Sequence, residues 1–169
     1  MKKILKLTLF VAFSFVVSSV SAQKLGRVNV EELLMSMPEI TQMQSDLEVL
    51  RKDYSNNLET MQVELNNKLA DYQKNESTMI ESVRALKEKE MQDLNQRMQQ
   101  FEQSAVQELQ AKQNQMIEPI LAKARAAVAE VAKEGGYTAV FDESAGALAY
   151  YDDSVVNLLS AAKAKLGIK

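Results

Sequence analysis

Few residues of this sequence have types and spacing that could do chemistry. They are three pairs of adjacent carboxylates, Glu31–Glu32, Asp142–Glu143 and Asp152–Asp153. Two carboxylates held close together can act as acid and base on a glycosidic bond, and carboxylate oxygens bind calcium. Each pair lies at the predicted end of a strand or helix, where helix N-terminal charge or the solvation of a turn accounts for it. We therefore expect no catalytic site and no metal site at these pairs.

The chain of 169 residues contains no cysteine and no histidine. Thiolate and imidazole metal sites, nucleophile–histidine systems and disulfides are therefore excluded. Its five glycines form neither a GxxxxGK nor a GxGxxG pattern, so no phosphate-binding loop is expected. The sequence predicts a protein that has no cofactor and is not an enzyme.

Residues 1–22 have the composition of a cleavable secretory signal. Three lysines precede an apolar stretch over 7–17, and small residues follow up to a cleavage site before Gln23. The apolar stretch is shorter than the roughly 20 residues of a membrane-spanning helix; an uncleaved anchor is the alternative. The signal predicts a periplasmic protein.

Removal of the signal changes the charge of the chain. The signal holds three lysines and no acid, so the mature chain has 17 basic and 23 acidic residues, a net charge of −6. A nucleic-acid partner would require a basic face. We therefore expect no nucleic-acid binding, and the charges leave membrane contact open.

The element that must carry the function lies between the two prolines. Pro38 and Pro119 bracket 80 residues without Gly or Pro, rich in Glu, Gln, Lys, Leu and Met, which favour helices. Apolar residues recur there at steps of three and four, as along the seam of a coiled coil. The first series is Ile40, Met43, Leu47, Leu50, Tyr54, Leu58, Met61, Leu65, Leu69 and Tyr72, and the second is Met91, Leu94, Met98, Phe101 and Ala105.

A break near the midpoint of this stretch predicts a turn. Residues 73–78 are all polar, and Thr78 with Glu81 forms a capping-box pattern that starts a helix. Two helices folded back on each other would cover both apolar stripes, with the tip near 74–78. One long straight helix in a dimer is the alternative.

Other signals mark the remaining helix ends. Ser36 with Glu39 is a second capping-box pattern. Pro119 should kink the second long helix, and Gly135–Gly136 should end it. Ser154 is expected to cap a last short helix.

The two ends of the chain predict a small sheet. Residues 24–30 alternate between apolar and polar and predict a strand. Residues 137–142 and 147–152 predict two further strands, which the short turn 143–146 joins into a β-hairpin.

These elements together predict an α+β, mostly helical fold. Residues 23–38 and 119–169 would form a small β/α oligomerisation body, and residues 39–118 a long antiparallel coiled-coil hairpin arm. A body of about 65 residues is marginal alone, and three strands leave open edges. We therefore expect an oligomer whose body strands meet across subunits; a dimer and a trimer both fit the seam.

The arm is rich in methionine and amides. Met43, Met61, Met79, Met91, Met98 and Met116 all lie in it. Methionine adapts to varied partners, so loosely packed arms could splay and hold unfolded chains; the alternative is that these side chains simply fill the seam.

The sequence resembles the Skp, or OmpH, family of periplasmic chaperones. The resemblance covers the whole mature chain. It rests on KLGRVNV with EELLMSMPE, on the long Gly-free helical stretch, and on the closing YTAVFDESAGALAYYDDSVV. It implies a homotrimer whose three arms surround a cavity and hold unfolded outer-membrane β-barrel proteins without ATP.

The resemblance also implies places for particular residues. The candidate client contacts on the arms are Met61, Tyr72, Met79, Met91 and Met98. The candidate oligomer interface, in the body strands, is Val28, Val30, Val140, Phe141, Leu148 and Tyr150. Well-studied members of the family are basic, whereas this mature chain is acidic, so no lipopolysaccharide-binding residues are carried over. A structural or adaptor coiled-coil protein of the cell envelope is the alternative function.

Overall fold

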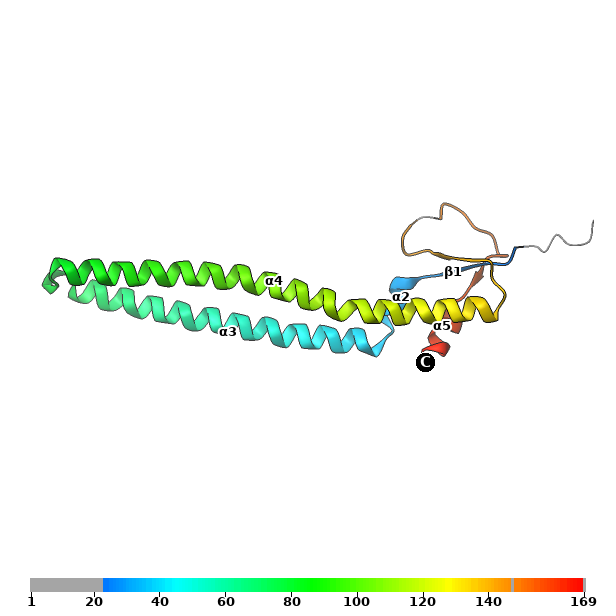
Figure 1. Cartoon of the computed structure of the whole chain (residues 1–169), viewed down its shortest axis with the longest axis horizontal. Helices are drawn as coiled ribbons and strands as arrows, with labels where there is room; N and C mark the ends of the chain where they lie inside the picture. Colours follow the sequence, from blue (N-terminus) through cyan, green and yellow to red (C-terminus); the bar gives the residue numbers. More distant parts are fainter. Residues whose placement is uncertain (1–22, 147, 169) are drawn as a thin grey trace, which may run out of the picture. The chain divides into compact units, whose positions relative to one another are not determined.

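The computed structural model describes residues 23–146 and 148–168; the predicted signal at 1–22 lies outside them. The elements run in the order β1 (Leu25–Val28), α2 (Val30–Met35), α3 (Pro38–Asn75), the 3-10 helix η1 (Glu76–Thr78), α4 (Glu81–Glu134), β2 (Ala139–Asp142), β3 (Val156–Asn157) and α5 (Leu159–Lys165) (Figure 1). The fold is α+β and mostly helical, as expected.

The contacts divide the chain into two units. The arm unit comprises residues 31–126, and the head unit comprises residues 23–30 and 127–167 of the described chain. Helix α4 contributes to both. No helix among the described residues is both long enough and apolar enough to cross a membrane.

The arm unit is an antiparallel helical hairpin. Helices α3 and α4 lie side by side, joined by η1 (Figure 1). This confirms the hairpin and its turn, and the single straight helix was wrong. The seam side chains are buried or half-buried at the predicted spacing, with one exception: Leu69 is 43% exposed and Lys68 takes its place in the seam.

The head unit contains a parallel sheet in the order β2-β1-β3. Leu25 pairs with Ala139 on one side of β1, and Gly26 pairs with Val156 on the other. Val28 and Leu158 are buried. A Cβ at Gly26 would lie only 2.8 Å from Leu158 Cδ1, so glycine lets this core side chain approach the strand.

The predicted β-hairpin was wrong. Residues 148–152 form no strand, so Leu148 and Tyr150 lie in a loop, and the third strand is β3. Within the described residues nothing pairs with the outer edge of β2. The loop instead contacts β1 through side chains, with Arg27 stacked over the ring of Tyr151. Val30 also lies outside the sheet, because α2 begins there.

The three predicted N-caps were wrong, because none of these residues directly precedes its helix. Each hydroxyl donates a hydrogen bond backward instead of accepting one from a helix N–H. Ser36 Oγ donates to Leu33 O (2.7 Å), Thr78 Oγ1 to Asn75 O (2.9 Å) and Ser154 Oγ to Asp152 Oδ1 (2.5 Å). Helix α3 instead begins with Pro38 in its first turn, and α5 begins only at Leu159.

The predicted end of α4 is confirmed. The helix runs through Pro119 without interruption and ends at Glu134. Gly136 follows with φ 67°, and Tyr137 N donates to Ala132 O at 2.9 Å. This is the glycine-terminated helix stop that the Gly135–Gly136 pair predicts.

Candidate functional site

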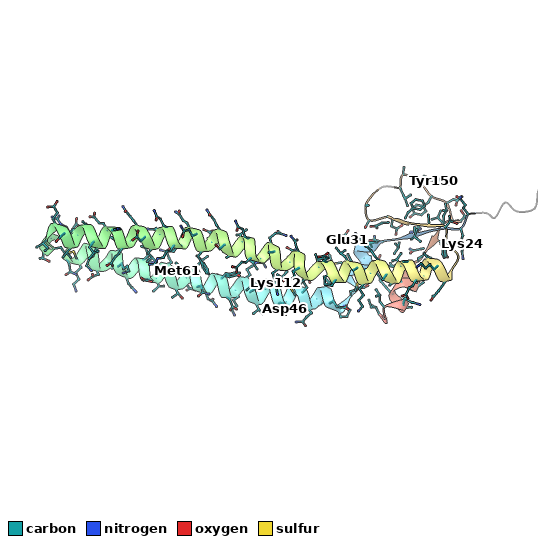
Figure 2. All side chains as sticks on the ribbon, in the orientation of Figure 1. Lys24, Glu31, Asp46, Met61, Lys112 and Tyr150 are labelled. Atoms are coloured by element: carbon teal, nitrogen blue, oxygen red, sulfur yellow. The ribbon has the colours of Figure 1, made fainter. Side chains whose placement is uncertain are left out.

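The predicted client-contact residues all lie in the arm unit. Met61, which is labelled in Figure 2, lies on α3 with Tyr72. Met91 and Met98 lie on α4, and Met79 directly follows η1. All five side chains are half-buried along the seam. Part of each side chain is therefore open to solvent.

We call residues 31–65 and 94–126 of the arm unit its base. The base has an ordinary apolar interior. Leu94 is completely buried, and Ala105 is 6% exposed. The rings of Tyr54 and Phe101 meet edge to face across the helices, with centroids 5.8 Å apart, a favourable aromatic geometry. The other buried residues of this unit are Leu33, Met37, Ile40, Met43, Ile120 and Ala124.

The distal segment of the arm, residues 66–93, is built differently. No side chain in this segment is buried. Its half-buried side chains are Lys68, Tyr72, Asn75, Met79, Lys87 and Met91, so the inner face is mainly polar. An amphipathic helix pair normally places its apolar residues there.

The apolar side chains of the distal segment lie outside. Ile80 is 68% exposed, Leu86 57%, Leu69 43% and Val83 36%. Ile80, Val83 and Leu86 follow one another at three-residue spacing near the start of α4, on neighbouring positions of the helix surface. Single exposed apolar residues are normal, whereas these three lie together on one stretch of the helix surface.

Polar contacts hold the two helices together in the distal segment. Lys68 Nζ lies 3.0 Å from Glu90 Oε2, and Lys87 Nζ lies 2.6 Å from Asp71 Oδ2. Tyr72 Oη donates a hydrogen bond to Glu88. Each of these contacts joins α3 to α4, and each is partly open to solvent.

These contacts shift the ionisation of their members. The hydrogen bond from Lys87 lowers the pKa of the Asp71 carboxyl, and the same bond raises the pKa of Lys87. The hydrogen bond to Glu88 raises the pKa of Tyr72 to about 12. All three shifts favour the hydrogen-bonded forms that join the helices.

A shallow groove of about 360 Å³ opens beside these contacts. It is lined by Leu65, Leu69, Glu88, Met91, Gln92 and Asn95. Its apolar surface could accommodate an aliphatic side chain of a bound peptide, and its amides could bond the peptide backbone. A second groove, of about 400 Å³, lies at the base of the arm beside Met43, Met116 and Ile120.

The predicted interface residues lie in the head unit. Val28 is only 2% exposed and packs inside its own chain, whereas Phe141 on β2 is 40% exposed and Tyr150 in the loop is 84% exposed. Val140 and Leu148 are half-buried. Strands β2 and β3 are both edge strands, so each offers unpaired backbone groups to another chain.

Arg27, which the sequence analysis missed, connects the loop after β2 to the sheet. Arg27 on β1 lies 2.5 Å from Glu143 Oε2 and stacks over the ring of Tyr151 at 4.4 Å. Both charged side chains are only about one-fifth exposed. An arginine within the alternating strand 24–30 was the available signal, because a charge in a small sheet needs a partner.

Two of the three carboxylate pairs contain a residue that makes structural hydrogen bonds. Asp142 Oδ1 accepts hydrogen bonds from Val30 N and Ser144 N, and Asp152 Oδ1 accepts one from Ser154 N. Partial burial raises the pKa of Asp142, but the hydrogen bonds outweigh this and leave it below its ordinary value. Among the residues that the structure describes, no three acidic side chains gather into a metal-binding group.

Comparison with known proteins identifies a family and several relatives of this chain. A family described as "Outer membrane protein (OmpH-like)" matches residues 24–166. A "Chaperone protein Skp" of Yersinia enterocolitica is 31% identical over 137 residues, 81% of this chain and 82% of that protein. A protein of the same name from Photorhabdus laumondii is 30% identical over 151 residues, 89% of this chain and 90% of that protein.

Proposed function

Because this chain belongs to the OmpH-like family, we propose that it is an ATP-independent holdase chaperone of the periplasm, which binds unfolded outer-membrane β-barrel proteins. Its relatives are named chaperones, and the family is not enzymatic. The residues of the arm must then supply binding surface rather than chemistry.

The observation that carries this proposal is the distribution of side chains in the distal segment of the arm, residues 66–93, where apolar side chains lie outside and mainly polar ones lie inside. Its apolar side chains, among them Ile80 and Leu86, are exposed, while its inner face holds Lys68, Tyr72 and Lys87. Exposed apolar surface of this kind suits unfolded chains, whose own apolar residues are uncovered. The half-buried methionines beside it can adjust to clients of different sequence.

We also propose that the head assembles the protein into a homotrimer. Residues 23–38 and 119–169 would form the oligomerisation body, and residues 39–118 the client-holding arm. The open edges of β2 and β3 and the exposed Phe141 and Tyr150 support this. Three arms around one cavity would let many weak contacts act together on one client.

A structural or adaptor coiled coil of the envelope is the competing function. Such a protein would have a fixed, folded partner and a densely packed seam along its arm. The polar interior of residues 66–93 counts against it, because a scaffold gains nothing from a weakly packed tip.

The proposal is tested by aggregation of an unfolded client. The mature chain, from Gln23 to Lys169, is added to a urea-unfolded outer-membrane β-barrel protein as the urea is diluted. We expect light scattering to fall to the baseline near one trimer per client. The same barrel folded in detergent is the control and should not bind; unchanged scattering at every excess would show that the chain is not a holdase.

A further inference from the structure

The distal segment of the arm, residues 66–93, contains no fully buried side chain. Its half-buried side chains are Lys68, Tyr72, Asn75, Met79, Lys87 and Met91. The cross-helix contacts that the structure shows there are two ion pairs and one tyrosine–carboxylate hydrogen bond. This part of the hairpin therefore closes through polar contacts and half-buried side chains, without a buried core.

Those contacts are weak individually. The side chains of the Lys68–Glu90 pair are 33% and 46% exposed, and those of the Lys87–Asp71 pair are 35% and 51% exposed. An ion pair exposed to this degree shifts an equilibrium by only about two- to fivefold. The base of the arm is held instead by buried side chains such as Leu94 and Ile120. Local opening should accordingly begin at the tip and stop at Leu94.

We propose that residues 66–93 are a latch whose helices separate locally and, in the open form, bind one apolar segment of an unfolded polypeptide. This inference rests on the proposed chaperone function. It adds the place where the client binds and the contacts that keep that place closed. Opening uncovers Met79 and Met91 and joins them to the already exposed Leu69, Ile80 and Leu86. Lys68, which occupies a seam position, keeps the closed form from becoming too stable.

The charge of the segment fits this kind of occupant. Residues 66–93 contain five basic and six acidic side chains, so the surface has almost no net charge. An anionic membrane or a nucleic acid would need a basic surface. An apolar stretch of polypeptide needs only the uncovered aliphatic and thioether side chains.

Hydrogen exchange of the full mature chain tests whether the latch opens. Salt screens ion pairs but leaves apolar packing intact. Amides of 66–93 should exchange about threefold faster in 0.5 M than in 0.05 M NaCl, while amides around Leu94–Ala105 should not respond. Equal protection of tip and base, or no response to salt at the tip, would overturn the proposal.

Substitution of Lys68 tests its place in the latch. Lys68→Met puts an apolar side chain into the seam, so distal exchange should slow about threefold and lose much of its salt response. Glu90→Gln removes the partner charge and should change exchange in the opposite direction. Lys52→Met, at an exposed position of the same helix, is the matched control and should behave as the unchanged protein.

Client affinity separates this inference from the chaperone function itself. With the urea-unfolded barrel as probe, Lys68→Met should bind about threefold more weakly than Lys52→Met, and Glu90→Gln should bind more tightly. Equal affinities of the three variants would overturn the latch while the chaperone function stands. An unmodified chain that binds no unfolded barrel would refute the chaperone function and, with it, the client role of the latch.

Discussion

At the residue scale, the phenol of Tyr72 reports directly on closure of the arm. Its hydrogen bond to Glu88 raises its pKa to about 12 from the ordinary 10.0. Because the folded-state pKa is raised, the stability from this bond is fully present below pH 10 and is lost as the pH rises through about 12.

An ultraviolet titration of the phenolates measures this. We expect the last tyrosine step to lie near pH 12 and to disappear in Tyr72→Phe. Tyr150→Phe, at a side chain that is 84% exposed, is the control and should leave the late step in place. The hydrogen bond to Glu108 also raises the pKa of Tyr54, so all the proteins compared carry Tyr54→Phe. A step near pH 12 that survives Tyr72→Phe in this background would contradict the hydrogen bond.

Leu94 marks the place where apolar packing of the arm begins. It is completely buried, so Leu94→Ala leaves a cavity and should lower the free energy of unfolding by about 3 kcal/mol. Leu69→Ala, at a side chain that is 43% exposed, should cost less than about 1 kcal/mol. Urea unfolding followed by circular dichroism checks both; equal losses would refute the division between base and tip.

The residues of the distal seam show how far spacing alone predicts a site. Steps of three and four correctly identified the seam on both helices. The prediction chose Leu69 over Lys68 because it looked for apolar side chains. Strict alternation of steps of three and four leads from Leu65 to Lys68. Its long aliphatic stem can lie in the seam while its amine reaches Glu90.

At the element scale, the helices were more predictable than the strands. The 80 residues without Gly or Pro predict a helical hairpin, and the structure has one. The strand prediction at 147–152 failed because the residue pattern does not reveal that Tyr151 stacks with Arg27 of β1, a side-chain contact that a second strand beside β2 would not need. The caps failed because Ser36 and Thr78 do not directly precede their helices, and their hydroxyls donate backward to a carbonyl.

The loop after β2 depends on Arg27 of β1. Its guanidinium pairs with Glu143 and stacks on Tyr151, and the pair is about one-fifth exposed. Arg27→Met leaves a half-buried carboxylate without its partner and should lower the free energy of unfolding by about 2 kcal/mol, less than for a fully buried pair.

Thermal unfolding measures this loss. Arg51→Met is the control, because its pair with Glu48 is 66% and 70% exposed and should contribute about 0.5 kcal/mol or less. Similar melting temperatures for the two variants would mean that Arg27 does not anchor the loop.

At the scale of the whole molecule, we expect the head to carry the assembly and the arm to carry the client. Phe141 is 40% exposed on the edge strand β2, so Phe141→Glu should place a charge in the subunit interface and dissociate the trimer. Val106→Glu, at a side chain on the arm that is 63% exposed, is the matched control and should leave assembly intact. Sedimentation velocity distinguishes them; a trimer that persists in Phe141→Glu would exclude this edge from the interface.

The central claim is that a homotrimer of this chain holds one unfolded outer-membrane β-barrel protein by the surface of its arms. The mass of the mature protein in solution, measured by light scattering with and without the unfolded barrel, tests it most directly. We predict three chains alone, and three chains plus one client after mixing, without added ATP. A mass that does not change when the unfolded client is added would contradict the account.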